Sequence, residues 1–213
     1  MNDKSPISAS ASYLIILTVC VVFACAILCL VGVYLEWENW AYGYFMLPAY
    51  IVLYALIVNF LVFRIGVLRQ RKQYGKALGL IHKLSKWVSI GKQNSYLHAM
   101  AASVYFMTEN DEAMARELAL VVDKRWQFDR YGYLTFYHIF RKEEVLAREQ
   151  LALLSALSAK GEDALRTKQQ LELLLKIIDP AEQARRNENI QACLAITNND
   201  RIKKFLLEQE SKG

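Results

Sequence analysis

Two long runs of uncharged residues dominate the start of the chain. Residues 13–35 form a run of 23 positions without a charge, and a second uncharged run extends from Ala41 to Phe63. A helix rises about 1.5 Å per residue, so either run covers a hydrocarbon core about 30 Å thick. The pattern therefore predicts two transmembrane helices, which we place at 13–35 and 44–63.

The segment between the two predicted helices, 36–43, is too short for anything but a tight turn. It carries Glu36 and Glu38 and no base, and the Trp and Tyr residues in and around it are typical of a membrane interface. We therefore expect a hairpin of two transmembrane helices with a short extracytoplasmic turn. A cleaved signal peptide is an alternative for the first run, but its apolar core would span only about 7–15 residues. A lipoprotein cleavage box at 22–25 is another, but Phe23 is too bulky for that motif.

Positive charge is concentrated directly after the second run. From Arg64 to Lys92 there are eight Lys and Arg residues and no Asp or Glu, and Lys4 precedes the first run. Because basic residues favour the cytoplasmic side, we expect an integral protein of the plasma (inner) membrane with both termini cytoplasmic. Residues 1–12 would be a tail and 64–92 a basic juxtamembrane helix. That helix would either lie on anionic lipid headgroups or form the first helix of the next domain. Its candidate membrane-surface residues are Arg64, Arg69, Arg71, Lys72, Lys76, Lys83 and Lys86.

Residues 93–213 predict a cytoplasmic domain built only of helices. Apolar residues recur every three or four positions, and the breaks fall at polar or Gly-containing positions. Asp179 is expected to cap a helix that starts at Pro180, and Asn199 or Asp200 to cap the last helix. With the preceding helix included, the expected segments are 67–88, 94–108, 111–123, 129–141, 143–159, 162–178, 180–196 and 199–210.

A helical repeat is visible in this domain. A shift of 32 residues aligns Tyr105 with Tyr137 and the run 111–117 with 143–149, with four identities in seven positions. A weaker third copy lies upstream, at 74–78. Each aligned block has an aromatic residue near the end of one helix, then a short polar turn, then a helix that opens with acids. The pattern predicts helical hairpins, and an irregular bundle whose Glu-, Ala- and Leu-rich helices align by composition is the alternative.

The hairpin pattern resembles the tetratricopeptide family. The repeat of that family, about 34 residues long, pairs an aromatic residue in its first helix with a small residue early in its second, as Tyr105 and Ala113 do. Ala101 or Ala102 would lie at the tight crossing of the two helices. The resemblance covers residues 74–155, although the turn is slightly short and no unit ends in Pro. It implies a solenoid of helix pairs that binds another protein. From Glu162 onward the 32-residue spacing fades, so the last three helices would form a terminal cap or a separate arm.

Catalytic chemistry is not recognisable in the chain. There is no nucleotide-binding loop, nucleophile elbow or metal-binding helix, and His82, His98 and His138 stand apart in the sequence. Three of the four cysteines lie in the first uncharged run, so no pair is placed to form a disulfide. From Gln93 onward 17 basic residues balance 18 acidic ones, which argues against a nucleic-acid partner. We expect no enzyme activity, no cofactor and no metal.

Aromatic residues supply the candidate partner-binding surface. They are dense from Trp126 to Tyr133 and on to Phe140. Most would be core residues, and those left exposed on a concave face would anchor a peptide or a helix. The candidate partner-binding residues are Tyr96, Tyr105, Trp126, Tyr133 and Tyr137, with Lys124 and Arg130 as charged neighbours.

The sequence as a whole predicts a membrane-anchored helical-repeat adaptor or scaffold that holds a partner protein at the cytoplasmic membrane surface. An alternative is a small subunit or regulator of a membrane complex, of the channel, transporter or toxin-immunity type, that acts through its transmembrane hairpin. Candidates for helix–helix contact in that hairpin are Asn59, and Cys20 with Ala24. An enzyme with an unrecognised site is a third hypothesis.

Overall fold

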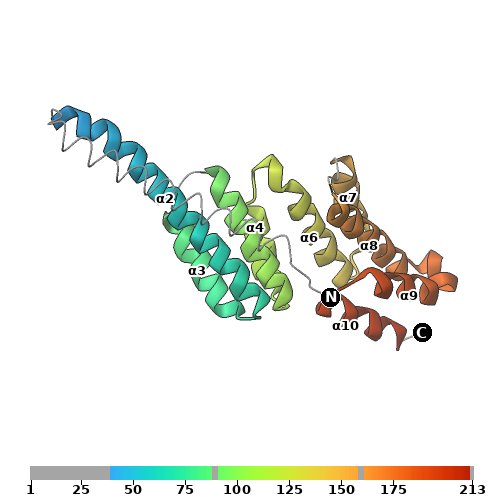
Figure 1. The fold of residues 1–213 in the computed structure, drawn as a ribbon. Helices are drawn as coiled ribbons and strands as arrows, with labels where there is room; N and C mark the ends of the chain where they lie inside the picture. Colours follow the sequence, from blue (N-terminus) through green and yellow to red (C-terminus); the bar gives the residue numbers. More distant parts are fainter. Residues whose placement is uncertain (1–38, 88–90, 158–160, 212–213) are drawn as a thin grey trace. The chain divides into compact units, whose positions relative to one another are not determined.

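The computed structural model describes residues 39–87, 91–157 and 161–211 (Figure 1). Every regular element in these ranges is a helix, which confirms the expected all-α class. The predicted first span at 13–35, with Cys20 and Ala24, lies outside the described residues. The helices are α2 (Asn39–Gln70), α3 (Tyr74–Trp87), α4 (Gly91–Met107), α5 (Asp111–Ala119), α6 (Gln127–Phe140), α7 (Glu144–Ala156), α8 (Glu162–Ile178), α9 (Arg186–Ile196) and α10 (Asp200–Glu210), with two short 3-10 helices, η1 (Lys124–Trp126) and η2 (Pro180–Arg185).

The chain divides into two compact units, residues 1–80 and 81–213. The division falls inside α3, so the first unit contains α2 and the start of α3. The second unit contains the rest of α3 and all later helices. We refer to residues 81–213 as the helical domain.

α2 is an apolar helix of 32 residues, about 48 Å long at 1.5 Å per residue. Over Tyr50–Gln70 its mean hydropathy is 2.4, and among the described residues it is the helix long and apolar enough to cross a membrane. Large apolar side chains are exposed around much of its circumference; Tyr50 is 68% and Phe60 is 60% exposed. Such a surface is unfavourable in water and suited to apolar surroundings. Most of the predicted second span, 44–63, lies in this exposed part of α2.

A turn at residues 71–73 divides the helix that we expected at 67–88. Lys72 adopts a left-handed backbone conformation with a φ of 56°, and the N–H of Gln73 donates to the carbonyl of Leu68, 2.9 Å away. Together these are the marks of a Schellman motif, which ends a helix. The expectation was wrong because no Gly or Pro marks the break, and the Arg and Lys residues there are good helix formers.

The same turn occurs three times in the described ranges. Glu109 and Lys142 have φ values of 57° and 59°, and the N–H groups of Asn110 and Glu143 donate to carbonyls five residues earlier, at 3.0 and 2.9 Å. The residue that completes each motif also begins the next helix, because its carbonyl accepts an N–H four residues later. The three N–H groups that donate to it belong to Ala77, Met114 and Ala147. One three-residue link therefore ends one helix and starts the next.

The spacing of these turns corrects the repeat alignment. Glu109 and Lys142 lie 33 residues apart, whereas the sequence alignment used 32. That alignment rested on Glu, Ala and Arg identities, most of which lie outside the core, whereas buried apolar positions determine how a helix packs. Ala113, which we had matched to the small tetratricopeptide residue, is only half-buried, and its neighbour Met114 takes the buried position. With the correct spacing, the buried residues Met114, Leu118 and Val121 align with Ala147, Leu151 and Leu154.

Side chains cap helix starts in the later part of the chain as expected. The Asp179 carboxylate accepts the N–H of Ala181 at 2.8 Å, with a proline at the first helical position. Oδ1 of Asn199 accepts the N–H of Arg201 at 3.0 Å. The bounds of α8 are those that the sequence predicted. The segment expected at 180–196 is divided into η2 and α9, so the cap and proline start a short 3-10 helix first.

Neighbouring helices pack in pairs to form the core of the helical domain. α4 packs on α5, α6 on α7 and α8 on α9, and α6 also contacts α4 and α8. Figure 1 shows α6, α7 and α8 side by side. Phe106, Ile139 and Leu171, one from each of α4, α6 and α8, belong to one buried cluster. α10 packs on α9, and its Ile202 and Leu206 join the same core.

Replacing Lys142 by glycine is expected to stabilise the helical domain by about 1 kcal/mol, because a left-handed conformation strains any residue that has a Cβ. Lys142→Val is expected to destabilise the domain, since β-branched side chains fit this conformation worst. Thermal unfolding of the full chain in detergent micelles, followed by far-ultraviolet circular dichroism, measures both changes. A Lys142→Gly variant that melts below the wild type would contradict the turn geometry.

Candidate partner-binding cleft

A cleft of about 200 Å³ opens between four helices of the helical domain. α6 contributes half of its lining residues, and α4, α8 and the start of α10 contribute the others. A water molecule takes about 30 Å³ in the liquid, so the cleft has room for several waters or for the end of a partner's side chain. The lining residues are Phe106, Phe128, Asp129, Gly132, Tyr133, Phe136, Thr167, Gln170, Asn199 and Ile202.

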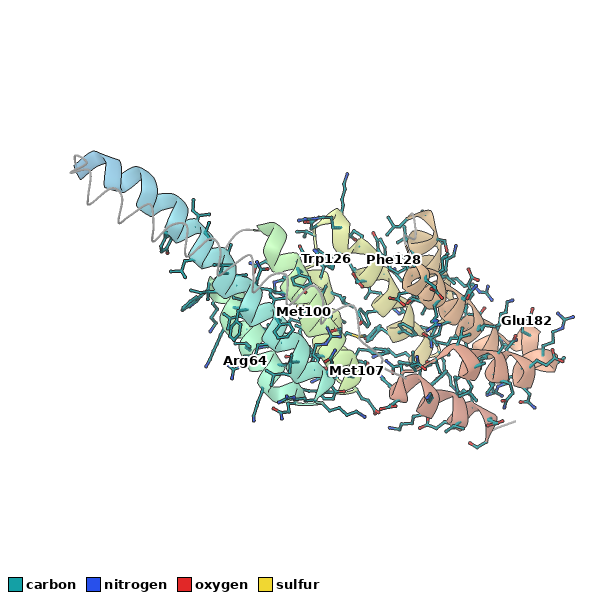
Figure 2. The ribbon with its side chains drawn as sticks, viewed as in Figure 1. Arg64, Met100, Met107, Trp126, Phe128 and Glu182 are labelled. Atoms are coloured by element: carbon teal, nitrogen blue, oxygen red, sulfur yellow. The ribbon has the colours of Figure 1, made fainter. Side chains whose placement is uncertain are left out.

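Aromatic rings form the apolar side of the cleft. The ring centroid of Phe106 lies 5.3 Å from that of Tyr133 and 5.2 Å from that of Phe136. These are the spacings of favourable tilted ring pairs. Phe128 adds another ring from the first turn of α6 (Figure 2). Because the rings pack on one another, they give the cleft a well-ordered aromatic wall.

Arg201 fixes the start of α10 beside this wall. Its guanidinium donates to the carbonyl of Phe106 at 2.9 Å and to the carboxylate of Asp111 at 2.7 Å. It also contacts two rings, at 4.8 Å from the centroid of Phe106 and 4.5 Å from that of Phe140. The Arg201 side chain is only 10% exposed, so these contacts replace most of its hydration. One cation thereby joins α10 to the last turn of α4 and the first turn of α5.

Asp129 is an acid in the cleft without a basic partner. In the part of the chain that the structure describes, its own backbone N–H is the polar group that acts on its carboxyl, and burial outweighs it and raises the pKa of Asp129. The folded protein therefore holds this proton to a higher pH than the unfolded chain does. It follows that the contribution of Asp129 to stability falls as the pH rises above the ordinary Asp value, and the ionised carboxylate is a cost at neutral pH.

Two more residues that line the cleft are of types that do not favour stability at their positions. Gln170 is a polar residue that is only 9% exposed, at a position where an apolar side chain would avoid the cost of burying an amide. Gly132 is buried, yet no atom lies within 4 Å of the position that a Cβ would take there. Crowding therefore does not require glycine, which costs about 1 kcal/mol relative to alanine inside a helix. Residues that cost stability and gather in one cleft are typical of a functional site.

The predicted partner-binding residues on α6 and near its start do not all lie in the cleft. Tyr133 is the one of the set that lines the cleft. Trp126 packs instead against Tyr96, with the two rings tilted and their centroids 4.6 Å apart. Lys124 is exposed, and the guanidinium of Arg130 donates to a backbone carbonyl at 3.4 Å.

The other two predicted aromatic residues contact charged or titratable neighbours. The ring of Tyr105 lies 6.5 Å from that of His82. The guanidinium of Arg141 lies 5.2 Å from the ring centroid of Tyr137. Neither tyrosine lines the cleft, so the surroundings of both differ from those of Tyr133.

The predicted membrane-surface residues lie on α2, α3 and the turn between them. Their contact with lipid stays a prediction. Asn59, the candidate for helix–helix contact, is exposed on α2. Of the predicted membrane-surface residues, Arg69 is half-buried. The exposed ones are Arg64 (Figure 2), Arg71, Lys72, Lys76, Lys83 and Lys86.

Each histidine in the helical domain contacts a glutamate. Nδ1 of His98 and Nε2 of His82 lie 2.7 and 3.3 Å from the carboxylate of Glu117, and Nδ1 of His138 lies 2.7 Å from that of Glu143. The hydrogen bond with His138 is the largest of the contacts that lower the pKa of Glu143. Within the described ranges, no group of three His, Cys, Asp or Glu residues is arranged to hold a metal ion.

Sequence reasoning missed Asp129, Gln170 and Arg201. One local signal existed, because Asp129 and Gly132 interrupt the aromatic run that ends at Tyr133. Gln170 and Arg201 gave no local signal, since the place of each at the cleft depends on contacts with helices that are distant in the sequence. The carbonyl that Arg201 binds is 95 residues distant.

Comparison with known proteins adds nothing on the role of the cleft. No protein-family model matches the chain, and no curated protein or solved structure matches it. A function has to be inferred from the residues themselves.

Arg201→Met is expected to destabilise the helical domain by roughly 2–4 kcal/mol, because it leaves Asp111 without its partner and removes a cation from two rings. Lys204→Met is the matched control on the same helix. Its ion pair with Glu109 is exposed on both sides, so we expect a loss below about 1 kcal/mol. Thermal unfolding of the full-length variants compares the two. Equal destabilisation would contradict the role given to Arg201.

Proposed function

We propose that this chain is a membrane-anchored adaptor, in which α2 is held in the bilayer and the helical domain binds a partner protein at the cytoplasmic membrane surface. The observation that carries the proposal is the exposed apolar surface of α2. Tyr50, Ile57 and Phe60 are 68%, 44% and 60% exposed. A bilayer would bury these side chains, and α2 is long enough to cross a bilayer.

The distribution of charge supports the cytoplasmic side for the helical domain. Residues 64–92 carry eight basic residues and no acid, whereas 36–43 carry two acids and no base. Basic segments next to a transmembrane helix stay on the cytoplasmic side. In the plasma or inner membrane, the basic residues at the end of α2 and on α3 would also meet anionic lipid headgroups, at about 1 kcal/mol for each one near the surface.

The three equal turns support the repeat that underlies the adaptor function. A shared Schellman link and a shared set of buried positions indicate successive helical hairpins, as in a tetratricopeptide-like array. Such arrays bind proteins through extended surfaces. Aromatic residues around a pocket are typical of binding hot spots, and the cleft beside α6 supplies such a pocket. The function we propose is recognition and localisation, without a chemical step.

Asn59 favours a second candidate function. Its amide is exposed on α2, in the part of the helix that a bilayer would surround. A polar side chain at such a depth bonds to a neighbouring membrane helix. A subunit or regulator of a channel, transporter or toxin-immunity complex would use Asn59 in this way, through its transmembrane hairpin.

Capture of a partner from membranes separates the two candidates. The tagged full chain is extracted in mild detergent, and the proteins that co-purify are quantified by mass spectrometry. Gly132→Leu fills the cleft, and Asn59→Leu removes the amide from α2. The adaptor predicts a protein that co-purifies with the wild type and with Asn59→Leu, and that is mostly lost with Gly132→Leu.

The opposite pattern would support the second candidate, since binding through α2 depends on Asn59 and not on the cleft. Recovery of lipid alone with the wild type would contradict the adaptor. Thermal unfolding of Gly132→Leu checks that it still folds, and Asp129→Asn provides a second cleft variant with little change in volume.

A further inference from the structure

The cleft combines aromatic rings with hydrogen-bond acceptors and has no positive charge. None of its lining residues is Lys, Arg or His. The Asp129 carboxylate has no basic partner among the described residues, and Gln170, a polar residue that is only 9% exposed, also lines the cleft. A carboxylate, an amide oxygen and aromatic faces are the groups that recognise an organic cation.

The same domain already holds one guanidinium with this chemistry. Arg201 bonds to the carboxylate of Asp111 at 2.7 Å and to a backbone carbonyl at 2.9 Å. Its guanidinium also contacts the rings of Phe106 and Phe140. Phe106 also lines the cleft, so the ring that contacts the guanidinium of Arg201 belongs to the cleft wall as well.

We propose that the cleft binds an arginine side chain that the partner protein presents. This rests on the proposed adaptor function and names the chemistry by which the partner is recognised. A guanidinium is planar and stays charged, so it lies against aromatic rings while its several N–H groups donate to a carboxylate. It would give the Asp129 carboxylate a charged donor, and the amide oxygen of Gln170 is a further acceptor among the lining residues. An anionic ligand would be repelled by Asp129, and a neutral one would leave that carboxylate desolvated and unpaired.

Peptide binding to the full chain tests this proposal. The chain is placed in nanodiscs of zwitterionic lipid, so that basic peptides are not attracted by the membrane. Three glycine-rich pentapeptides differ only in the central residue, which is arginine, its neutral isostere citrulline, or lysine. Saturation-transfer nuclear magnetic resonance measures their affinities. We expect arginine to bind roughly tenfold more tightly than citrulline, as for the loss of one charged hydrogen-bond partner, and more tightly than lysine.

Asp129→Asn is expected to remove the preference for arginine over citrulline. Asp163→Asn is the matched control, because it makes the same change at an exposed acid in the first turn of α8 and should leave the preference intact. Burial raises the pKa of Asp129, so at neutral pH Asp129→Asn should melt no lower than the wild type. Lost binding then cannot be ascribed to unfolding.

Equal affinities for arginine and citrulline, or an arginine preference that survives Asp129→Asn, would overturn the proposal. Lysine binding as tightly as arginine would overturn the assignment to a guanidinium. The adaptor function fails separately, in the capture experiment, which reports whether any protein depends on the cleft. The peptides report only which chemistry the cleft prefers.

Discussion

The contact on which the rest of the helical domain depends is the one made by Arg201. Its guanidinium joins α10 to the end of α4 and the start of α5, and it contacts the rings of Phe106 and Phe140. Residues on either side of it in the chain, Asn199 and Ile202, line the cleft. Arg201 holds the start of α10 there together with the packing of α10 on α9, so the contact that stabilises the fold also shapes the proposed binding site.

The acid inside the cleft differs from many acids elsewhere in the domain. Outside it, acids commonly have partners, as where Arg148 bridges Glu144 and Asp179. Within it, Asp129 has no basic partner in the part of the chain that the structure describes. Selection for stability alone would replace such a group, because an unpaired desolvated carboxylate destabilises the folded state. The proposed recognition of an arginine explains why it is present, and the exposed apolar surface of α2 explains where that recognition would take place.

Much of the fold could be predicted from local sequence signals. The bounds of α8 and the caps at Asp179 and Asn199 depend on short-range chemistry and were confirmed. The break at Lys72 was missed because lysine is an ordinary helix former, so its residue type does not signal the left-handed conformation that it adopts. The repeat alignment was one residue out because the identities that suggested it lie mostly outside the core. Of the predicted site residues only Tyr133 lines the cleft, since a cleft between four helices depends on contacts as distant as that of Arg201.

Photo-crosslinking from the cleft tests the central claim most directly. A photoreactive phenylalanine analogue replaces Tyr133 in the full chain, or Leu153 on α7 as a control that is exposed and does not line the cleft. Native cells are irradiated, and the membranes are then washed with alkaline carbonate. The account predicts a discrete adduct from position 133 that stays in the washed membranes and joins the chain to an arginine-containing segment of another protein. An adduct from position 153 but none from 133, or a chain that carbonate removes from the membranes, would contradict it.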